Sequence, residues 1–294
     1  MLHKSGFVNI VGNPNVGKST LMNIMVGDKI SIITNKSQTT RHRIMGIVNE
    51  ENYQIVYSDT PGVIKPNYKL QENMLNFSLS ALSDADIILY VTDIYEKIDK
   101  NQDFLQKIQK LKVPILILIN KIDLSNQEKI NEQFEIWEKI LPNSEIFPIS
   151  ALEKFNLENL FNRILELLPE SPPYFDKDVF TDKSERFFVS EIIREKILLN
   201  YKKEIPYSVE IEIEEFKRQI KPKKILKIKA VIHVERETQK GIIIGNKGKS
   251  IKKFGTQARI DIEKFFGEKV FLEFFVKLNK NWKDKEFQIK NFGY

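Results

Sequence analysis

The chain of 294 residues contains no cysteine. This absence excludes disulfide bonds, thiolate catalysis and cysteine-bound metals, and it is compatible with a reducing compartment. No apolar run approaches the roughly 20 residues that a membrane-spanning helix needs. Residues 1–6 are polar and do not form the apolar core of a signal peptide. We therefore expect a soluble intracellular protein.

Charge is divided unevenly along the chain, which has 46 Lys and Arg against 40 Asp and Glu, a net charge of +6. Residues 1–170 carry 18 basic and 21 acidic side chains, a net charge of −3. Residues 171–294 carry 28 basic and 19 acidic side chains, a net charge of +9. This excess indicates a polyanionic partner for the second part, although a lysine-rich solvated surface would have the same composition.

Strand-like and helix-like apolar patterns alternate through the first part of the chain. This order predicts an α/β fold with a mainly parallel sheet and helices on both faces. Three prolines within residues 169–173 then interrupt the pattern, so we place a linker at residues 171–184 between domains 1–170 and 185–294. The expected strands are residues 7–11, 44–48, 53–57, 87–91, 113–119 and 145–149, and the expected helices are 19–26, 70–82, 102–111, 129–140 and 157–168.

Residues 185–294 predict a smaller α+β domain. Two of its expected strands alternate apolar and polar residues, as half-buried strands do. The expected order is a helix at 185–200, strands at 208–216 and 226–234, a short helix at 240–244, a helix at 250–266 and a strand at 270–276.

The first expected strand is followed by a segment that fits the phosphate-binding pattern G-x-x-x-x-G-K-[ST] in full. Backbone N–H groups there can surround phosphate oxygens, and the next helix directs its positive end at them. Lys18 should reach the β- and γ-phosphates, and Ser19 should bind Mg²⁺. An ordinary tight turn is the alternative for each glycine. The predicted contact residues are Gly12, Asn13, Pro14, Asn15, Val16, Gly17, Lys18, Ser19 and Thr20.

A second motif, Asp59-Thr60-Pro61-Gly62, ends another expected strand. Asp59 has the position of the acidic group near the metal, which it would hold indirectly, and the Gly62 N–H would bind the γ-phosphate. The next residue is Val63, where many small GTPases have a glutamine that orients the attacking water. Valine cannot hydrogen-bond water, so we expect slow intrinsic hydrolysis.

The polar loop at residues 31–43 can close over the γ-phosphate and the metal. It contains Gln38, Thr39 and Thr40. Thr40 is the predicted Mg²⁺ contact, with Thr39 as the rival, and a plain solvated loop is the alternative. Lys18, Thr40, Asp59 and Gly62 are thus the candidate catalytic residues.

A third motif, Asn120-Lys121-Ile122-Asp123, follows the most apolar strand. The Asp123 carboxylate can accept two hydrogen bonds from guanine, which adenine cannot donate. Lys121 would lie along the base, Asn120 would tie this loop to the phosphate loop, and the segment Ser150-Ala151-Leu152 would offer an N–H to guanine O6. Three motifs in this order predict a switch that binds GTP or GDP with Mg²⁺.

The second domain contains Gly245-Asn246-Lys247-Gly248 between two expected helices. A G-x-x-G loop lets a nucleic-acid backbone approach closely, and the α-β-β-α-α-β order predicts a type II KH domain that binds RNA. A protein-interaction domain with a basic face is the alternative. The candidate RNA-binding residues are Gly241, Ile242, Ile243, Ile244, Gly245, Asn246, Lys247, Gly248, Lys249, Lys252 and Lys253.

The motifs together resemble the Era family of GTPases, which have a C-terminal KH domain. The resemblance spans nearly the whole chain. Val63 agrees with the family's pattern, and Leu152 departs from it only mildly. It implies a monomer that binds 16S rRNA near its 3′ end, assembles the small ribosomal subunit and associates peripherally with the inner membrane. Its most specific segments are residues 38–42 and 239–245, and residues 237–238, 276–278 and 282–284 also carry it.

Two function classes remain open on the residues alone. One is an enzyme that acts as a switch, in which GTP hydrolysis resets RNA affinity. The other is a constitutive RNA-binding protein with a structural, non-cycling nucleotide site. Intact Lys18, Ser19, Thr40 and Asp59 favour the switch, and nothing suggests the acceptor site of a metabolic kinase.

Overall fold

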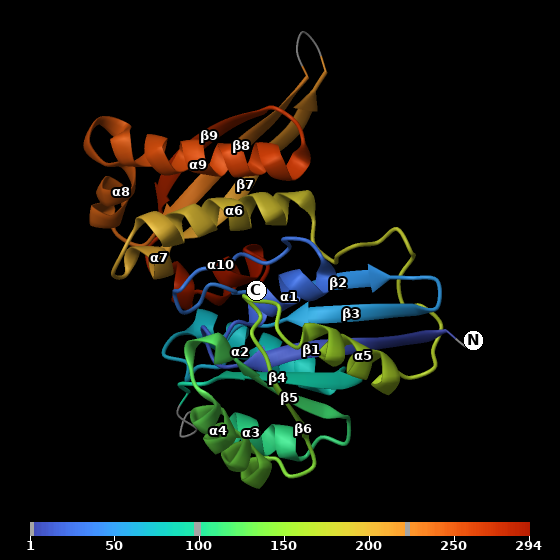
Figure 1. Cartoon of the computed structure of the whole chain (residues 1–294). Helices are drawn as coiled ribbons and strands as arrows, with labels where there is room; N and C mark the ends of the chain where they lie inside the picture. The colour runs from blue at the N-terminus through green and yellow to red at the C-terminus, as the bar shows by residue number, and fades with distance from the viewer. Residues whose placement is uncertain (1–2, 97–100, 221–223) are drawn as a thin grey trace. The chain divides into compact units, whose positions relative to one another are not determined.

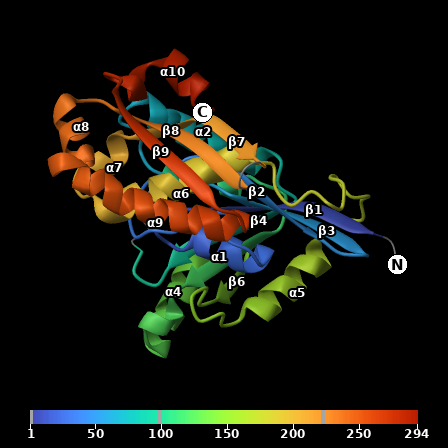
Figure 2. The same ribbon diagram turned by 90° about the horizontal axis from the view of Figure 1, so that it is seen from above.

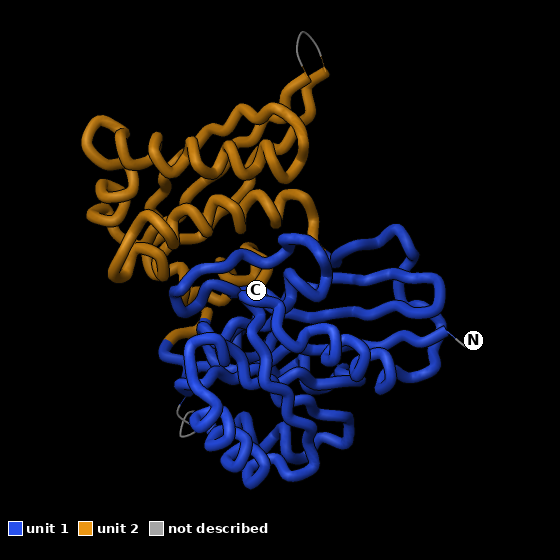
Figure 3. The backbone as a smooth tube through the Cα atoms, in the orientation of Figure 1, with its two compact units in different colours: residues 1–67, 71–182 blue, residues 68–70, 183–294 orange. Residues whose placement is uncertain are grey.

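The computed structural model describes residues 3–96, 101–220 and 224–294 (Figure 1). The chain divides into two compact units (Figure 3). Unit 1 comprises Met1–Asn67 and Gln71–Asp182, and unit 2 comprises Tyr68–Leu70 and Lys183–Tyr294. Within the described residues, no helix has both the length and the apolar character needed to cross a membrane.

Unit 1 is built on a six-stranded sheet in the order β2-β3-β1-β4-β5-β6. β2 is antiparallel to β3, and all other neighbours are parallel. The predicted α/β class is therefore confirmed. The strands are β1 (Lys4–Gly12), β2 (Ile44–Asn49), β3 (Tyr53–Asp59), β4 (Ile87–Asp93), β5 (Ile115–Asn120) and β6 (Glu145–Pro148).

Helices cover both faces of this sheet because its central strands are apolar on both sides. Buried side chains of α2, α3 and α4 pack on one face, around Trp137 and Tyr90. α1 contacts β1, β2 and β3. The helices are α1 (Lys18–Val26), α2 (Lys69–Ser83), α3 (Gln102–Gln109), α4 (Gln127–Ile140) and α5 (Leu157–Leu167), with a 3-10 turn η1 (Ile122–Leu124).

Because β1, β3, β4, β5 and β6 run in one direction, the loops that follow them begin at one edge of the sheet. Ile10 pairs with Asp59, and Asp93 pairs with Asn120. The three predicted nucleotide motifs are thereby brought to the same edge.

The segment expected to be a linker, residues 171–184, lies in unit 1 as far as Asp182. Thr181 forms an antiparallel bridge with Gly46 at the open side of β2, and the Ile47 N–H donates to the Phe180 carbonyl at 2.9 Å. The buried Gln54 accepts hydrogen bonds from the Tyr174 and Phe175 N–H groups. Backbone groups that β2 would leave unpaired as an edge strand find partners here.

Unit 2 contains a three-stranded sheet in the order β7-β8-β9, with β7 antiparallel and β9 parallel to β8. The predicted order of elements is confirmed. Figure 2 shows the three strands running alongside one another. The elements are α6 (Glu185–Asn200), α7 (Ile205–Ser208), β7 (Glu210–Gln219), β8 (Ile225–Val234), α8 (Glu237–Ile244), η2 (Asn246–Gly248), α9 (Lys249–Phe266), β9 (Val270–Leu278), η3 (Trp282–Asp284) and α10 (Glu286–Asn291).

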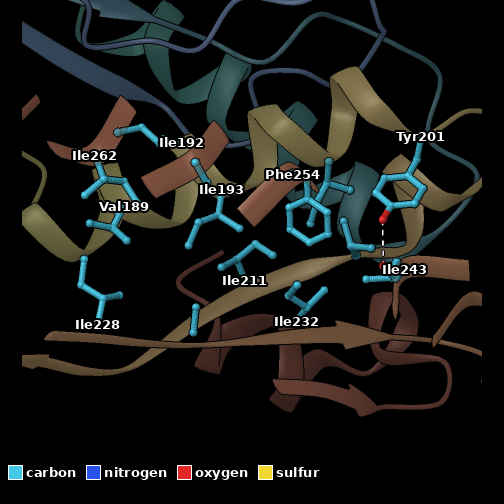
Figure 4. Close-up of a cluster of buried hydrophobic side chains, with 14 of the residues drawn as sticks. Val189, Ile192, Ile193, Tyr201, Ile211, Ile228, Ile232, Ile243, Phe254 and Ile262 are labelled. Atoms are coloured by element: carbon cyan, nitrogen blue, oxygen red, sulfur yellow. Dashed lines mark hydrogen bonds between the residues drawn. The ribbon is translucent and has the colours of Figure 1, made fainter. Parts of the chain in front are cut away.

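The core of unit 2 lies between this sheet and the helices α6 and α9 (Figure 4). Ile193 and Phe254 from the helices meet Ile232 from the sheet, and all three are fully buried. The Tyr201 hydroxyl donates to the Ile243 carbonyl at 2.8 Å, which joins the end of α6 to the end of α8. The G-x-x-G loop directly after α8 is thus attached to a rigid core.

Candidate functional site

The phosphate loop joins β1 to α1 through a backbone that few residue types tolerate. Gly12 and Gly17 have φ of 143° and 101°, and Asn15 has φ of 66°. A Cβ atom at Gly17 would lie 2.2 Å from the Asn120 side-chain nitrogen. Glycine is required there both for the left-handed conformation and for this close approach.

Lys18 begins α1 and is only 6 % exposed. Its Nζ donates to the carbonyls of Gly12 at 3.0 Å and Asn13 at 2.7 Å. Burial lowers the pKa of Lys18 to about 8, against the opposing attraction of Asp59 and Glu96. A buried cation whose hydrogen-bond partners among the described residues are two carbonyls fits an anionic ligand, whose charge would restore the ordinary pKa.

Three oxygen-bearing side chains converge at the start of α1. The Ser19 hydroxyl donates to Asp59 Oδ2 at 2.6 Å, and Thr40 Oγ1 lies 2.9 Å from Ser19 Oγ and 3.3 Å from Asp59 Oδ2. Asp59 is fully buried, and its Oδ1 has no hydrogen-bond partner among the described residues. Burial raises the pKa of Asp59, whereas the Ser19 hydrogen bond and the Lys18 charge lower it.

This cluster fits Mg²⁺. An octahedral Mg²⁺ ion with ligands at about 2.1 Å places neighbouring ligand oxygens about 2.9 Å apart, which is the spacing of the Ser19 and Thr40 hydroxyls. Among the described residues, no group of three or more His, Cys, Asp or Glu could hold a metal. A site with few protein ligands is typical of magnesium that is shared with substrate phosphates.

The structure separates the two candidate threonines of the loop at residues 31–43. The Thr39 hydroxyl donates to the Lys36 carbonyl and lies 2.6 Å from the Thr34 hydroxyl. These contacts stabilise the conformation of the loop. Thr40 is the residue whose hydroxyl reaches Asp59.

Val63 is held away from the cavity. Its side chain is 3 % exposed and packs in the core with α2 and α3. Its N–H donates to the Gly12 carbonyl at 3.1 Å, and its carbonyl accepts from Asn101 Nδ2 at 2.8 Å. Gly62 abuts Pro14, since an added Cβ would lie 2.7 Å from the Pro14 Cα. The backbone of this segment is thus fixed against the phosphate loop.

Asn120 ties three loops together at the base-binding end. Its Nδ2 donates to the Val16 carbonyl at 2.8 Å, and its Oδ1 accepts from the Ala151 N–H at 2.9 Å. The Ser150 hydroxyl donates to Asp123 Oδ1 at 2.6 Å, which orients that carboxylate.

Lys121 has φ of 63° and reaches back across the phosphate loop. Its Nζ donates to the Asn15 carbonyl and to Asp93 Oδ2, both at 2.7 Å. The ion pair with Asp93 was not predicted from the sequence. The feature that could have indicated this ion pair is the position of Asp93 at the end of β4, because β4 lies beside the strand that ends at Asn120.

One cavity of about 490 Å³ gathers most of the predicted nucleotide residues, a volume typical of small-molecule sites at about 300–1,000 Å³. Gly12, Asn13, Val16, Asp59, Thr60, Pro61, Val63 and Ser150 are outside its lining. Ile32, Ile33, Thr34, Asn35, Lys36 and Leu124 line it without having been predicted. The predicted residues that line it are Pro14, Asn15, Gly17, Lys18, Ser19, Thr20, Gln38, Thr39, Thr40, Gly62, Asn120, Lys121, Asp123, Ala151 and Leu152.

In unit 2, three residues of the G-x-x-G loop have positive φ, at 71° for Gly245, 50° for Lys247 and 73° for Gly248. Most of the predicted basic side chains lie in solvent on or beside this loop. Ile243 is fully buried, so its side chain belongs to the core, whereas Ile242 is 51 % exposed. The exposed candidates are Gly241, Ile242, Asn246, Lys247, Lys249, Lys252 and Lys253, and Ile244, Gly245 and Gly248 are half-buried.

A groove of about 320 Å³ lies between α9 and β9, next to this loop. Gly255 allows the close packing beneath it, because an added Cβ would lie 2.7 Å from the Phe274 ring. Of the candidate RNA-binding residues given above, Lys252 lines this groove. Its residues are Ile251, Lys252, Gly255, Thr256, Arg259, Leu272 and Phe274.

A P-loop site with a guanine-reading loop, followed by a KH fold, defines a GTPase of the RNA-associated class. A family model described as 50S ribosome-binding GTPase matches residues 7–121, and a KH domain model matches residues 204–283. GTPase Era from Alkaliphilus metalliredigens is 43 % identical over 295 residues, covering all of both chains. GTPase Era from Staphylococcus haemolyticus is 42 % identical, covering 99 % of this chain and 97 % of the relative.

A solved structure of Era in complex with MgGDPNP and nucleotides 1506–1542 of 16S ribosomal RNA is 39 % identical, covers 99 % of each chain and has a TM-score of 0.95. A variant of Aquifex aeolicus Era bound to GDP and AlF₄⁻ is 38 % identical over the same share, with a TM-score of 0.94. The chain belongs to the Era family of GTPases, as the sequence motifs predicted.

Proposed function

We propose that this GTPase is a switch that binds GTP or GDP with Mg²⁺ and binds the 3′ region of 16S rRNA through its KH domain during small-subunit assembly. The observation that carries the switch is the convergence of Ser19, Thr40 and Asp59 beside the buried Lys18. The family member solved with MgGDPNP and 16S rRNA supports both ligands.

The roles of the nucleotide residues follow from their positions. Lys18 neutralises the β- and γ-phosphates, and the Gly62 N–H binds the γ-phosphate. Ser19 and Thr40 would hold Mg²⁺ through their hydroxyls, and Asp59, which accepts a hydrogen bond from Ser19, would contribute indirectly. The bound ion neutralises charge on the phosphate oxygens. Asp123, oriented by Ser150, reads guanine.

Hydrolysis by this site is slow without a partner. Val63 points into the core and has no group that could orient water. The segment Thr60-Pro61-Gly62 is rigid, because the Thr60 hydroxyl donates to the Ile10 carbonyl and the Ser78 hydroxyl donates to the Pro61 carbonyl, both at 2.8 Å. The water therefore has to be positioned by backbone, by another loop or by a bound partner.

In unit 2, the G-x-x-G loop receives the RNA backbone, with Lys247 and its neighbours neutralising phosphates. The groove between α9 and β9, whose lining includes Ile251, Leu272 and Phe274, accepts unstacked bases. The proposal includes a cytoplasmic monomer that acts on the small ribosomal subunit and meets the inner membrane only at its surface.

Base selection tests the nucleotide half of the proposal. Asp123→Asn should change the preferred nucleotide from GTP to xanthosine triphosphate, because the amide donates where the carboxylate accepts. We expect a change in the ratio of the two affinities of about a hundredfold, from two hydrogen bonds. Calorimetry with both nucleotides measures it, and unchanged GTP preference would show that another residue reads the base.

Turnover in the presence of RNA separates the switch from a constitutive RNA-binding protein. We expect RNA of the 16S 3′ region to raise the rate of GTP hydrolysis, measured as released phosphate. An RNA of equal length and scrambled sequence is the control. A rate that stays constant up to saturating RNA would favour the non-cycling alternative.

A further inference from the structure

The loop at residues 31–43 ends in a buried arginine that the proposed function does not use. Arg43 precedes β2 directly and follows Thr40 after only two intervening residues. Its side chain is 10 % exposed. A buried guanidinium at this place has to be fully paired, because an uncompensated buried charge is costly.

The partners of Arg43 come from three different elements. Its Nε donates to Ser58 Oγ on β3 at 2.5 Å, and its NH2 group donates to Asn9 Oδ1 on β1 at 3.2 Å. The two terminal nitrogens also donate to the two oxygens of Asp84, at 2.6 and 2.9 Å. This is the paired, planar geometry that arginine can satisfy and lysine cannot.

Asp84 lies directly after α2, and Asn9 fixes it there. Asn9 is fully buried, and its Nδ2 donates to the Ala81 carbonyl at 2.6 Å and to Asp84 Oδ1 at 2.8 Å. The same helix is bound to the second nucleotide segment, since Ser78 donates to the Pro61 carbonyl. Ser78 in α2 and Asp84 directly after it therefore hydrogen-bond to the segment at Pro61 and to Arg43, respectively. These belong to the two segments that we propose approach the γ-phosphate.

The distance from Arg43 to Thr40 makes this anchor effective. Each residue of extended chain spans at most about 3.6 Å, so a fixed Arg43 keeps Thr40 within about 11 Å, and the fully buried Arg41 between them restricts the path further. Thr40 has to remain within a few tenths of an ångström of its place, because Mg²⁺ requires near-ideal geometry.

We propose that Arg43 is a positioning residue that holds Thr40 in place for the metal and, through Asp84, couples the loop to α2. This inference rests on the proposed role of Thr40. The loop closes over the γ-phosphate, which GDP lacks, so the anchor affects the triphosphate state. Arg43→Lys should weaken binding of a non-hydrolysable GTP analogue by about tenfold while GDP affinity changes by less than about twofold.

The experiment compares the affinities for the analogue and for GDP by calorimetry at several Mg²⁺ concentrations. The variants are Arg43→Lys, Asp84→Asn and Thr40→Ala. Arg163→Lys is the matched control, because Arg163 makes similar multiple bonds to Glu145 and Glu166 in the same unit but far along the chain from the loop. Hydrogen exchange of residues 31–43 without nucleotide gives a readout that does not require the ligand.

We expect Arg43→Lys and Asp84→Asn to lower the ratio of analogue to GDP affinity, to raise the Mg²⁺ concentration required and to speed exchange in the loop, with Arg163→Lys unchanged. If only Thr40→Ala lowers the ratio, the inference about Arg43 is wrong and the role of Thr40 stands. If Thr40→Ala leaves the ratio unchanged, the proposed metal contact fails, and the inference fails with it. A uniform loss of both affinities in Arg43→Lys would show a role in stability only.

Discussion

The two units of the molecule use positive charge in opposite ways. In unit 1, Lys18 is buried and bound to two carbonyls, with a pKa lowered to about 8. In unit 2, Lys247 and Lys252 stand in solvent beside the G-x-x-G loop. A buried, fixed cation favours one ligand geometry, whereas exposed cations attract any polyanion and lose strength as salt rises.

This difference teaches where specificity resides in each unit. In the nucleotide site, hydrogen bonds to buried partners fix the orientation of the side chains, as at Asn120 and Ser19. In the KH domain, we propose that the lysines supply attraction to RNA and that the groove between α9 and β9 supplies a matching shape. Substitutions should therefore have large, local effects in unit 1 and smaller, distributed effects in unit 2.

The largest effect should come from Lys18→Ala. The substitution removes the buried cation that we propose contacts the β- and γ-phosphates. At least two charge-assisted hydrogen bonds to these phosphates would be lost with it. We expect GTP affinity to fall by about a thousandfold in calorimetry. RNA affinity without nucleotide should be unchanged, which is the control. A loss smaller than tenfold would contradict the comparison.

The next effect concerns pH and the nucleotide-free protein. The pKa of Lys18 is about 8 in the folded state and 10.5 in the unfolded state, so the unfolded chain binds more protons between these values. Stability contributed by this residue therefore rises from pH 8 to pH 10.5, by at most about 3 kcal/mol. Lys18→Met should remove this rise in urea unfolding curves.

The difference between the wild-type protein and Lys18→Met removes the contribution of groups that titrate in both proteins, such as the tyrosines. Parallel pH profiles for wild type and Lys18→Met would show that burial does not disfavour the charged lysine.

A pair of glycines in unit 2 should give opposite, smaller effects. Gly255→Ala places a methyl 2.7 Å from the Phe274 ring and should destabilise the unit by about 1–3 kcal/mol. Gly241→Ala meets nothing within 4 Å and lies inside α8, so it should stabilise the unit by about 0.5–1 kcal/mol. Hydrogen exchange of β8 and β9 measures both, and effects of the same sign would refute the packing argument.

The smallest effect should come from Lys247→Ala. Loss of one exposed phosphate contact should weaken RNA binding by about threefold to tenfold and reduce the slope of log affinity against log salt by about one. Nucleotide affinity should not change. Lys269→Ala removes another exposed lysine, beyond the other end of α9, and serves as the control. An equal loss in both variants would indicate attraction by net charge alone.

Much of the fold could be predicted from the sequence because its strands are short, apolar and separated by clear turn signals. β4 and β5 begin and end within two residues of their expected bounds. The C-terminal segment was less predictable. Trp282 donates to the Ser208 carbonyl and Tyr294 donates to Glu210, so η3 and α10 depend on contacts with residues more than 70 positions away.

Part of the cavity lining in unit 1 could also be predicted. Pro14, Asn15, Gly17, Lys18 and Ser19 line the cavity, and their motif, Gly12 to Ser19, was identifiable from spacing alone. The lining contributed by Ile32, Ile33 and Leu124 was not, because nothing in their local sequence distinguishes a cavity wall from a solvated loop. The Arg43 network was also not predictable, since its three partner residues are distributed over β1, β3 and the position directly after α2.

The sequence by itself specified the motifs on which the proposed chemistry rests: a phosphate-loop pattern, the Ser19 hydroxyl that follows it, the Asp123 carboxylate and a basic G-x-x-G loop. Each is local, because neighbouring residues along the chain supply the contacting atoms. Only the tertiary structure decided that Thr40 rather than Thr39 meets Asp59, that Val63 faces the core and that Ile243 is withdrawn from the surface. Those outcomes depend on packing between segments that are distant in sequence. Neighbouring atoms from those segments allow each buried side chain a single orientation.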